Sequence, residues 1–505
     1  MNHTSGSSTG YIGIQNEDSV CYLNSAIQQL FFLPAFRRIV LEMVLPGKDA
    51  GSYRFLSELQ SIFLALEEGR ERGREEVTDG SFDQQETALE GGLPATLSSS
   101  ATAHIGTTAT ATLVPPLSVD PLPLCSAIWD PNGQGEDDGE EEGEGGHLNP
   151  SVQMDVSEFF SLFFAQLFSS LAPSPPSAHP PLSLPCCAVS LSPLLHAKDV
   201  ICGEIRNELR AVRDGAAPLC VTSCEQFFFL SVSVGAVRVG TDSSTVIRDL
   251  HEALLDFSRE ERVDAMWPCE ERAGGGKAEG MGGGLELLSS TTSTSLSAKS
   301  LPPHLLIHLK RFRFDFLKMR QVKVNARFEF PDHIDLWQYT SEGIQEQREE
   351  ERKEREEMAW IERMKEGIDD GDIEGGEECD MGCDVSAKGS CKYTLSGVIV
   401  HTGTARDGHY FSLVKERQSG RGNRERGEND QSRGKEKGYE IEREKEREIE
   451  REEERESGRE QCRWLKMNDE EVTVFPVADM QGVTFGGAEG LVKRQSAFVL
   501  VYDRD

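Results

Sequence analysis

The fold is decided by the stretch NEDSVCYLNSAIQQL, which covers residues 16–30. A polar turn runs directly into apolar side chains at helical spacing, Leu23, Ile27 and Leu30, so a helix is expected to begin at or near Cys21. Unpaired N–H groups and the positive end of the helix dipole favour a thiolate at that position. Cys21 is therefore a candidate nucleophile. The alternative is a small buried residue, because free cysteine is among the most buried residue types.

Partners for a nucleophilic cysteine occur far downstream. The segment DGHYFSL (residues 407–413) contains His409, and WLKMND (residues 464–469) ends on Asn468 and Asp469. A cysteine early, a histidine late and an amide or acid after it is an order that cysteine proteases use. We predict that His409 is the base and that Asn468 orients it, with Asp469 as its substitute. The alternative for His409 is a structural core histidine, which is the role we expect for His401.

The Cys21 stretch and the Gly-His-Tyr stretch at 408–410 resemble the cysteine and histidine boxes of the ubiquitin-specific proteases, above all the very large members. The resemblance covers islands from Tyr11 to Tyr502. It implies a papain-like α+β fold in which a helical thumb bears Cys21, a β palm bears His409 and Asn468, and β fingers grasp ubiquitin. It also implies hydrolysis of the bond, often an isopeptide, at the C-terminal glycine of ubiquitin.

Several segments match the scaffold of that family. LPPHLLIHLKRF (301–312) reads as an apolar strand and is followed by KVNARFEFP (323–331). EQFFFLSVSV (225–234) predicts one strand, and residues 246–257 predict an amphipathic helix. Further strands are expected at 393–401, 410–414, 472–475 and 497–502.

The loop before the cysteine departs from the family pattern. By resemblance, Asn16 would stabilise the oxyanion, an interaction worth roughly 3 kcal/mol; an asparagine here also suits a turn or cap. Asp18 and Val20 replace the usual glycine and threonine. A carboxylate at 18 would raise the pKa of the thiol and repel the oxyanion. Restoring both family residues is therefore expected to raise kcat/KM, and a catalytically weak or inactive ubiquitin-binding module is the alternative function.

QMDVSEFF (153–160) resembles the segment with which the family grips the extended tail of ubiquitin. Gln153, Asp155 and Glu158 would then contact substrate, and Tyr410 would pack along the same channel. Asp155 followed three residues later by Glu158 is also the pattern of a helix capping box, and both roles are compatible.

Many family members hold a structural zinc in the fingers, expected here within 200–267, through two Cys-x-x-Cys pairs. In this chain the first pair is absent, and Cys269 is followed by Arg272 where the second cysteine would be. Cys220 and Cys224 have no matching pair. We therefore predict no metal and no other cofactor.

Composition indicates one catalytic domain, residues 11–505, interrupted by low-complexity inserts at about 67–146, 273–300, 342–389 and 417–461. Residues 124–129 are expected to form an ordered island, and the third insert to begin as a helix. Abrupt ends near both termini suggest a fragment or a chain reduced to its catalytic core.

The 505 residues carry 87 acidic and 53 basic side chains, a net charge of −34, which argues against nucleic-acid binding. Such a surface suits a basic partner such as the arginine-bearing tail of ubiquitin, although solubility or an acidic interaction scaffold would also explain it. No run of eighteen apolar residues predicts a membrane span, and the N-terminus lacks a signal-peptide pattern. The 12 cysteines favour an intracellular protein, cytoplasmic or nuclear. The oligomeric state is left open.

Overall fold

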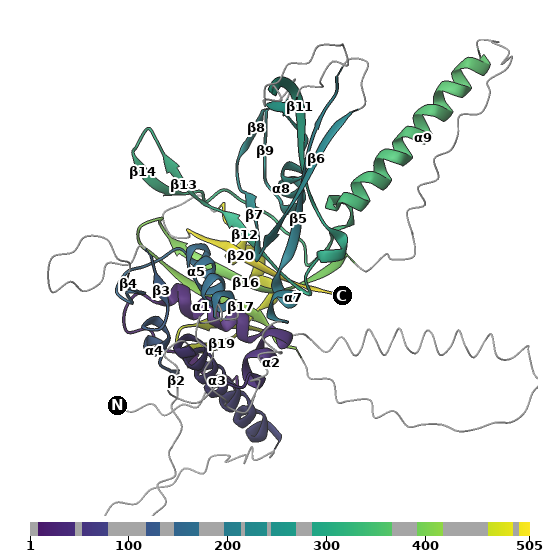
Figure 1. Ribbon diagram of the computed structural model, residues 1–505. Coiled ribbons are helices and arrows are strands. Elements are labelled where there is room, and N and C mark those ends of the chain that lie inside the picture. The colour runs from purple at the N-terminus through teal and green to yellow at the C-terminus, as the bar shows by residue number, and fades with distance from the viewer. Residues whose placement is uncertain are drawn as a thin grey trace, which may run out of the picture.

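A computed structural model describes residues 9–45, 53–78, 118–131, 146–170, 196–213, 218–239, 244–268, 285–365, 391–417, 463–487 and 494–505. The architecture is α+β, as predicted, with a helical lobe against one face of a large sheet, shorter helices against its other face, and a second sheet above it (Figure 1). The predicted insert at 417–461 lies almost wholly outside the described residues, as does most of 67–146.

The helical lobe is built from six helices and two short strand pairs: α1 (Cys21–Phe31), α2 (Pro34–Glu42), α3 (Arg54–Thr78), α4 (Leu122–Cys125), α5 (Val156–Ser169), α7 (Ala197–Ile201), β1 (Gly13–Ile14) with β2 (Ser118–Val119), and β3 (Trp129–Asp130) with β4 (Gly146–His147). Helix α3 extends beyond residue 67, so the first predicted insert begins later than expected. The expected island at 124–129 forms α4 and the start of β3.

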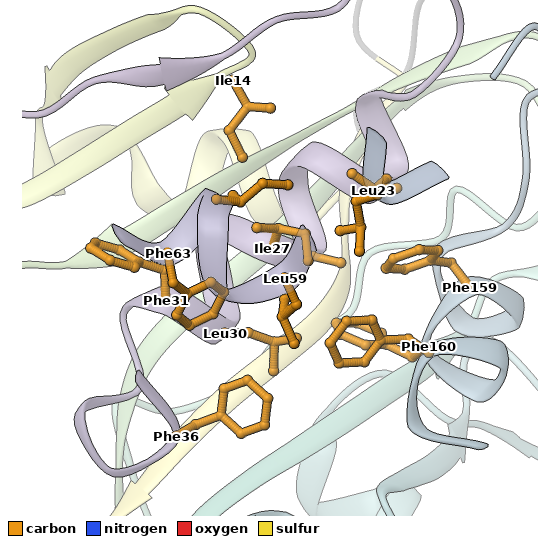
Figure 2. Packing of buried hydrophobic residues seen from close by; sticks show 14 of the residues in the cluster. Ile14, Leu23, Ile27, Leu30, Phe31, Phe36, Leu59, Phe63, Phe159 and Phe160 are labelled. Carbon is orange, nitrogen blue, oxygen red and sulfur yellow. The ribbon is translucent and has the colours of Figure 1, made fainter. Parts of the chain in front are cut away.

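Helix α1 is the centre of this lobe, because every one of its residues is buried. Figure 2 shows Leu23, Ile27 and Leu30 of α1 packed among side chains from α2, α3 and α5, including Phe36 and Phe159. The helix begins at Cys21, as its apolar spacing predicted.

The large sheet has the strand order β19-β18-β17-β16-β20-β12-β7, with β15 pairing to β16. Its strands are β7 (Phe229–Ser233), β12 (His304–Lys310), β15 (His333–Asp335), β16 (Lys392–Gly403), β17 (Gly408–Lys415), β18 (Trp464–Asn468), β19 (Glu471–Phe475) and β20 (Gln495–Arg504). All pairs are antiparallel except β12 with β7. The sheet places the ends of β17 and β18 beside α1.

The two strands β17 and β18 pair although a long stretch of sequence separates them. Ser412 lies opposite Met467 in their register. Just beyond the paired region, the backbone N–H of Glu416 donates to the carbonyl of Arg463 (2.8 Å), and the Arg463 Nε donates to the Glu416 carboxylate (2.7 Å). The chain therefore leaves and re-enters the sheet at adjacent points.

A second, four-stranded sheet has the order β10-β11-β5-β6. Its strands are β5 (Gly203–Ala211), β6 (Leu219–Phe227), β10 (Glu261–Pro268) and β11 (Leu285–Leu296); hairpins β8 (Val237–Val239) with β9 (Ser244–Val246) and β13 (Phe312–Asp315) with β14 (Arg320–Lys323) accompany it. The remaining elements are α8 (Leu250–Phe257), α9 (Ser341–Lys365), α11 (Met480–Thr484), η2 (Ala298–Ser300), η3 (Trp337–Tyr339) and η5 (Val477–Asp479).

Two predicted boundaries in this region were wrong. The strand predicted at 225–234 is two strands in different sheets, which separate at Phe228, whose ring stacks on Phe168. The helix predicted from 246 begins at Leu250, because the Asp249 carboxylate accepts a hydrogen bond from the Glu252 N–H and caps it.

The insert predicted at 273–300 contains strand β11 from Leu285 to Leu296. Its Ser/Thr-rich composition suggested an unstructured segment, but threonine favours strands and β11 is hydrogen-bonded to β10 on one side and β5 on the other. The charged insert predicted at 342–389 begins with α9, which projects away from the body of the molecule (Figure 1). In the described part of the chain, no helix is long and apolar enough to cross a membrane.

Candidate active site

Cys21 is the first residue of α1, and its side chain meets the strand that carries His409. The backbone N–H of Tyr410 donates to the Cys21 Sγ (3.4 Å), and Cys21 is only 4% exposed. Burial raises the pKa of the thiol, the Tyr410 N–H lowers it in part, and the Asp469 carboxylate raises it further. The helix terminus was expected to lower the pKa of Cys21, but burial outweighs that effect. Without substrate, Cys21 therefore favours the thiol form.

His409 lies on β17 with its side chain 39% exposed. Its Nε2 is 2.8 Å from the Asn468 Oδ1, which can only accept, so Nε2 carries the proton in that hydrogen bond. The Nδ1 atom is then the basic nitrogen. The predicted pair of His409 and Asn468 is therefore brought together, although 59 positions separate the two residues in sequence.

Asp469, which was predicted as a substitute for Asn468, is fixed by several hydrogen bonds. Its two carboxylate oxygens accept hydrogen bonds from Asn16 Nδ2 (2.9 Å) and Asn24 Nδ2 (2.8 Å), and Oδ2 is 3.7 Å from the His409 Nε2. Its backbone carbonyl accepts from the Ile14 N–H (3.0 Å). The residue has a positive φ of 53°, an uncommon conformation that these contacts maintain.

Asn24 is a site residue that sequence reasoning missed. It is 2% exposed and also donates to the Gln15 carbonyl (3.0 Å). One signal was present in the sequence: a polar amide three residues after Cys21 lies on the same face of the helix.

Asn16 connects the helix start to Asp469. Its Oδ1 accepts from the Val20 N–H (3.2 Å), which is the turn-stabilising role considered from sequence, while Nδ2 donates to Asp469. One amide hydrogen of Asn16 remains for an oxyanion, and that role stays a prediction.

Gln153 bridges the helical lobe and the histidine strand. Its Nε2 donates to the Gly408 carbonyl (2.9 Å) and its Oε1 accepts from the Gly408 N–H (3.3 Å). The amide thereby fixes the residue that precedes His409. These hydrogen bonds support a role in positioning His409, and the contact of Gln153 with substrate stays a prediction.

The other predicted substrate-binding residues lie near Gln153. Asp155 caps α5 by accepting a hydrogen bond from the Ser157 N–H (2.8 Å). Within the described residues, no hydrogen bond from the Glu158 side chain completes the predicted capping box. Burial raises the pKa of both carboxyl groups. Asp155 also lines a cavity of about 240 Å³ with His308 and Phe312. The Tyr410 side chain is 1% exposed and packs against His401, and its backbone N–H makes the hydrogen bond to the thiol.

The sequence profile of the family described as ubiquitin carboxyl-terminal hydrolase matches residues 12–101 and 141–502, which includes every residue of this site. The chain belongs to this family.

Two proteins that are similar to this chain are much longer than it is. Ubiquitin carboxyl-terminal hydrolase 9X of Mus musculus is 34% identical over 27% of this chain and 5% of its own length. Ubiquitin carboxyl-terminal hydrolase puf of Drosophila melanogaster is 23% identical over 81% of this chain and 8% of its own. A solved structure of the SAGA Ubp8/Sgf11/Sus1/Sgf73 deubiquitinase module bound to ubiquitin aldehyde aligns with a TM-score of 0.48 at 15% identity, over 100% of this chain and 72% of that one.

Asp18, which departs from the pattern of the family, does not raise the pKa of Cys21 as predicted. It is exposed, and the carboxylate that raises the pKa of Cys21 is Asp469. Because solvent screens an exposed charge, we now expect the repulsion between Asp18 and the oxyanion to be small. Val20, by contrast, is completely buried.

Asp18→Asn is therefore expected to leave kcat/KM within about twofold of the parent, because an exposed charge is screened by water and salt. The measurement is hydrolysis of a ubiquitin C-terminal fluorogenic substrate at two ionic strengths. A tenfold increase in the variant would show that the Asp18 carboxylate does act on the active site.

No metal centre is formed by the residues that the structure describes, since no group of three or more His, Cys, Asp or Glu side chains is suitably placed. Cys220 and Cys224 are exposed thiols on β6. Cys269 and Arg272, on which the prediction about zinc depended, lie outside the described residues.

Proposed function

We propose that this chain is a cysteine deubiquitinase that hydrolyses the bond between the C-terminal glycine of ubiquitin and an amine. The observation that carries the proposal is the convergence of Cys21, His409, Asn468 and Asp469 from distant parts of a chain that belongs to the ubiquitin carboxyl-terminal hydrolase family. Ubiquitin and ubiquitinated proteins are the partners that this activity requires.

The first step is attack on the glycine carbonyl. The basic Nδ1 of His409 takes the proton of the Cys21 thiol as Sγ bonds to the carbonyl carbon. The negative charge that develops on the oxygen is stabilised by backbone N–H groups at the start of α1 and by the remaining amide hydrogen of Asn16. His409 then gives its proton to the departing amine, and a thioester joins Cys21 to ubiquitin.

Hydrolysis of the thioester completes the cycle. His409 removes a proton from water, the hydroxide oxygen bonds to the thioester carbon, and Sγ leaves and is reprotonated. In both steps the imidazole becomes cationic while Asn468 keeps its orientation. The Asp469 carboxylate, 3.7 Å from Nε2, stabilises that cation.

Two carboxylates near the site could bind the basic tail of ubiquitin. Asp155 and Glu158 have pKa values raised by burial, so an arginine of the ubiquitin tail would relieve the cost of their charge. We therefore propose that the cavity beside Asp155 receives part of that tail. Exposed free thiols at Cys220 and Cys224 further support work in a reducing compartment, the cytoplasm or the nucleus.

The alternative is a ubiquitin-binding module with little activity, and the raised pKa of the buried Cys21 favours it. Ubiquitin carrying a C-terminal electrophile separates the two functions. We expect one covalent ubiquitin adduct on Cys21, seen by mass spectrometry of the intact protein and mapped by peptide sequencing. Cys125→Ala, which removes another buried thiol, is the matched control and should still form the adduct. Tight ubiquitin binding without an adduct would establish the inactive module instead.

A further inference from the structure

A cavity of about 540 Å³ lies between strand β14 and the loop that joins β16 to β17. Four of its lining residues are cationic, Arg320, Lys323, Arg406 and Arg494, and Asp407 is its one carboxylate. The cations come from three segments that are far apart in sequence. This cavity is distinct from the one beside Asp155, with which it shares no lining residue.

The cations of this pocket are not neutralised by the described part of the protein. Arg320, Arg406 and Arg494 form no ion pair with a described carboxylate, whereas nearby Arg327 pairs with Glu329 at 2.7 Å. In a chain with 87 acidic and 53 basic residues, a cluster of cations that lacks carboxylate partners among the described residues is unexpected from composition. The pocket therefore has a net positive charge that a ligand could compensate.

Lys323 shows the electrostatic cost of this arrangement. Its Nζ donates to the backbone carbonyls of His401 (2.7 Å) and Arg494 (2.7 Å), which leaves one N–H for a ligand. Burial, together with the nearby cations Arg311 and Arg494, lowers the pKa of Lys323 to about 7. An anion in the pocket would offset both the burial and the repulsion.

We propose that this pocket binds a small, free, multivalent oxyanion of the phosphate class. Guanidinium groups present a planar fork of donors that matches phosphate oxygens, and an ammonium adds a point charge. The volume admits a diphosphate-sized group. Because the wall formed by Gly403–Asp407 leads directly into Gly408 and His409, the anion would join the β13–β14 hairpin to the loop that precedes the histidine.

The test is calorimetric titration of the full chain with pyrophosphate, in potassium chloride at constant ionic strength and without ubiquitin. We expect one site per chain. The double variant Arg320→Gln/Arg494→Gln should bind at least about tenfold more weakly, because two charge-assisted contacts are removed. The matched control is Arg352→Gln/Arg355→Gln, which removes the same charge from exposed positions on α9. Melting curves without ligand verify that both variants fold.

Absence of binding to the parent at millimolar pyrophosphate would overturn the proposal. Equal weakening in the α9 control would also overturn it, because the binding would then reflect net charge alone. The titration contains no substrate, so its outcome is independent of the proposed hydrolase activity: a chain that binds pyrophosphate without cleaving ubiquitin would retain the anion site and lose the proposed function.

Discussion

Cys21→Ala is expected to lower turnover of a ubiquitin C-terminal fluorogenic substrate by a factor on the order of 10⁴ or more, about 5.5 kcal/mol in the barrier. The expectation follows from the position of Sγ at the start of α1, where the Tyr410 N–H reaches it from the histidine strand. Ubiquitin affinity should be unchanged, because the substitution removes a single atom from a buried site.

The control for this prediction is Cys125→Ala. Cys125 is also buried, and burial raises the pKa of its thiol to about 12, yet it lies on α4 away from His409. The control should retain full turnover. Equal activity of the Cys21 variant and the parent, measured on purified proteins with the same melting temperature, would eliminate Cys21 as the nucleophile.

Asp469→Ala is expected to lower kcat/KM by roughly 10³, because two effects act together. The carboxylate lies 3.7 Å from the His409 Nε2 and favours the imidazolium, with an attraction that water at the exposed part of the ring weakens. The change also leaves the amides of Asn16 and the buried Asn24 without their acceptor. We expect the loss in kcat rather than in KM, because the imidazolium forms only during the reaction.

Asn468→Ala is the comparison for Asp469→Ala. It removes a neutral hydrogen bond that orients the ring, so its effect should be smaller, on the order of 10²-fold. Stopped-flow measurement of thioester formation, with melting temperatures alongside, distinguishes chemistry from folding. A larger loss in Asn468→Ala than in Asp469→Ala would show that orientation outweighs charge at this site.

Most of the large sheet could be predicted from sequence, because its central strands are continuous apolar runs that are buried. The predicted strand at 497–502 lies within β20, and that at 393–401 lies within β16. Helix α1 was equally clear from the spacing of Leu23 and Ile27. The four-stranded sheet was harder to predict, because its strand β11 is rich in serine and threonine. This strand is stabilised by hydrogen bonds to a neighbouring strand on each side.

The fine geometry of the site could not be predicted in the same way. Sequence order indicated Cys21, His409 and Asn468, but the firm hold on Asp469 depends on Asn24, a contact across 445 positions. Asp18 was misread because its neighbourhood in sequence suggested proximity to the thiol, whereas the turn directs it to solvent. Tertiary contacts and side-chain direction decided both cases.

The adjacent exit and entry points at Glu416 and Arg463 have an evolutionary consequence. Hydrogen bonds between these two residues, at the edge of the β17–β18 pair, already hold the two ends of the intervening segment close together. Doubling the length of such a segment costs only about 0.6 kcal/mol in closure entropy. Sequence can therefore accumulate, shrink or be exchanged at this point while His409 and Asn468 keep their register, which makes it a place where new regulatory modules can be acquired at little cost to the catalytic core.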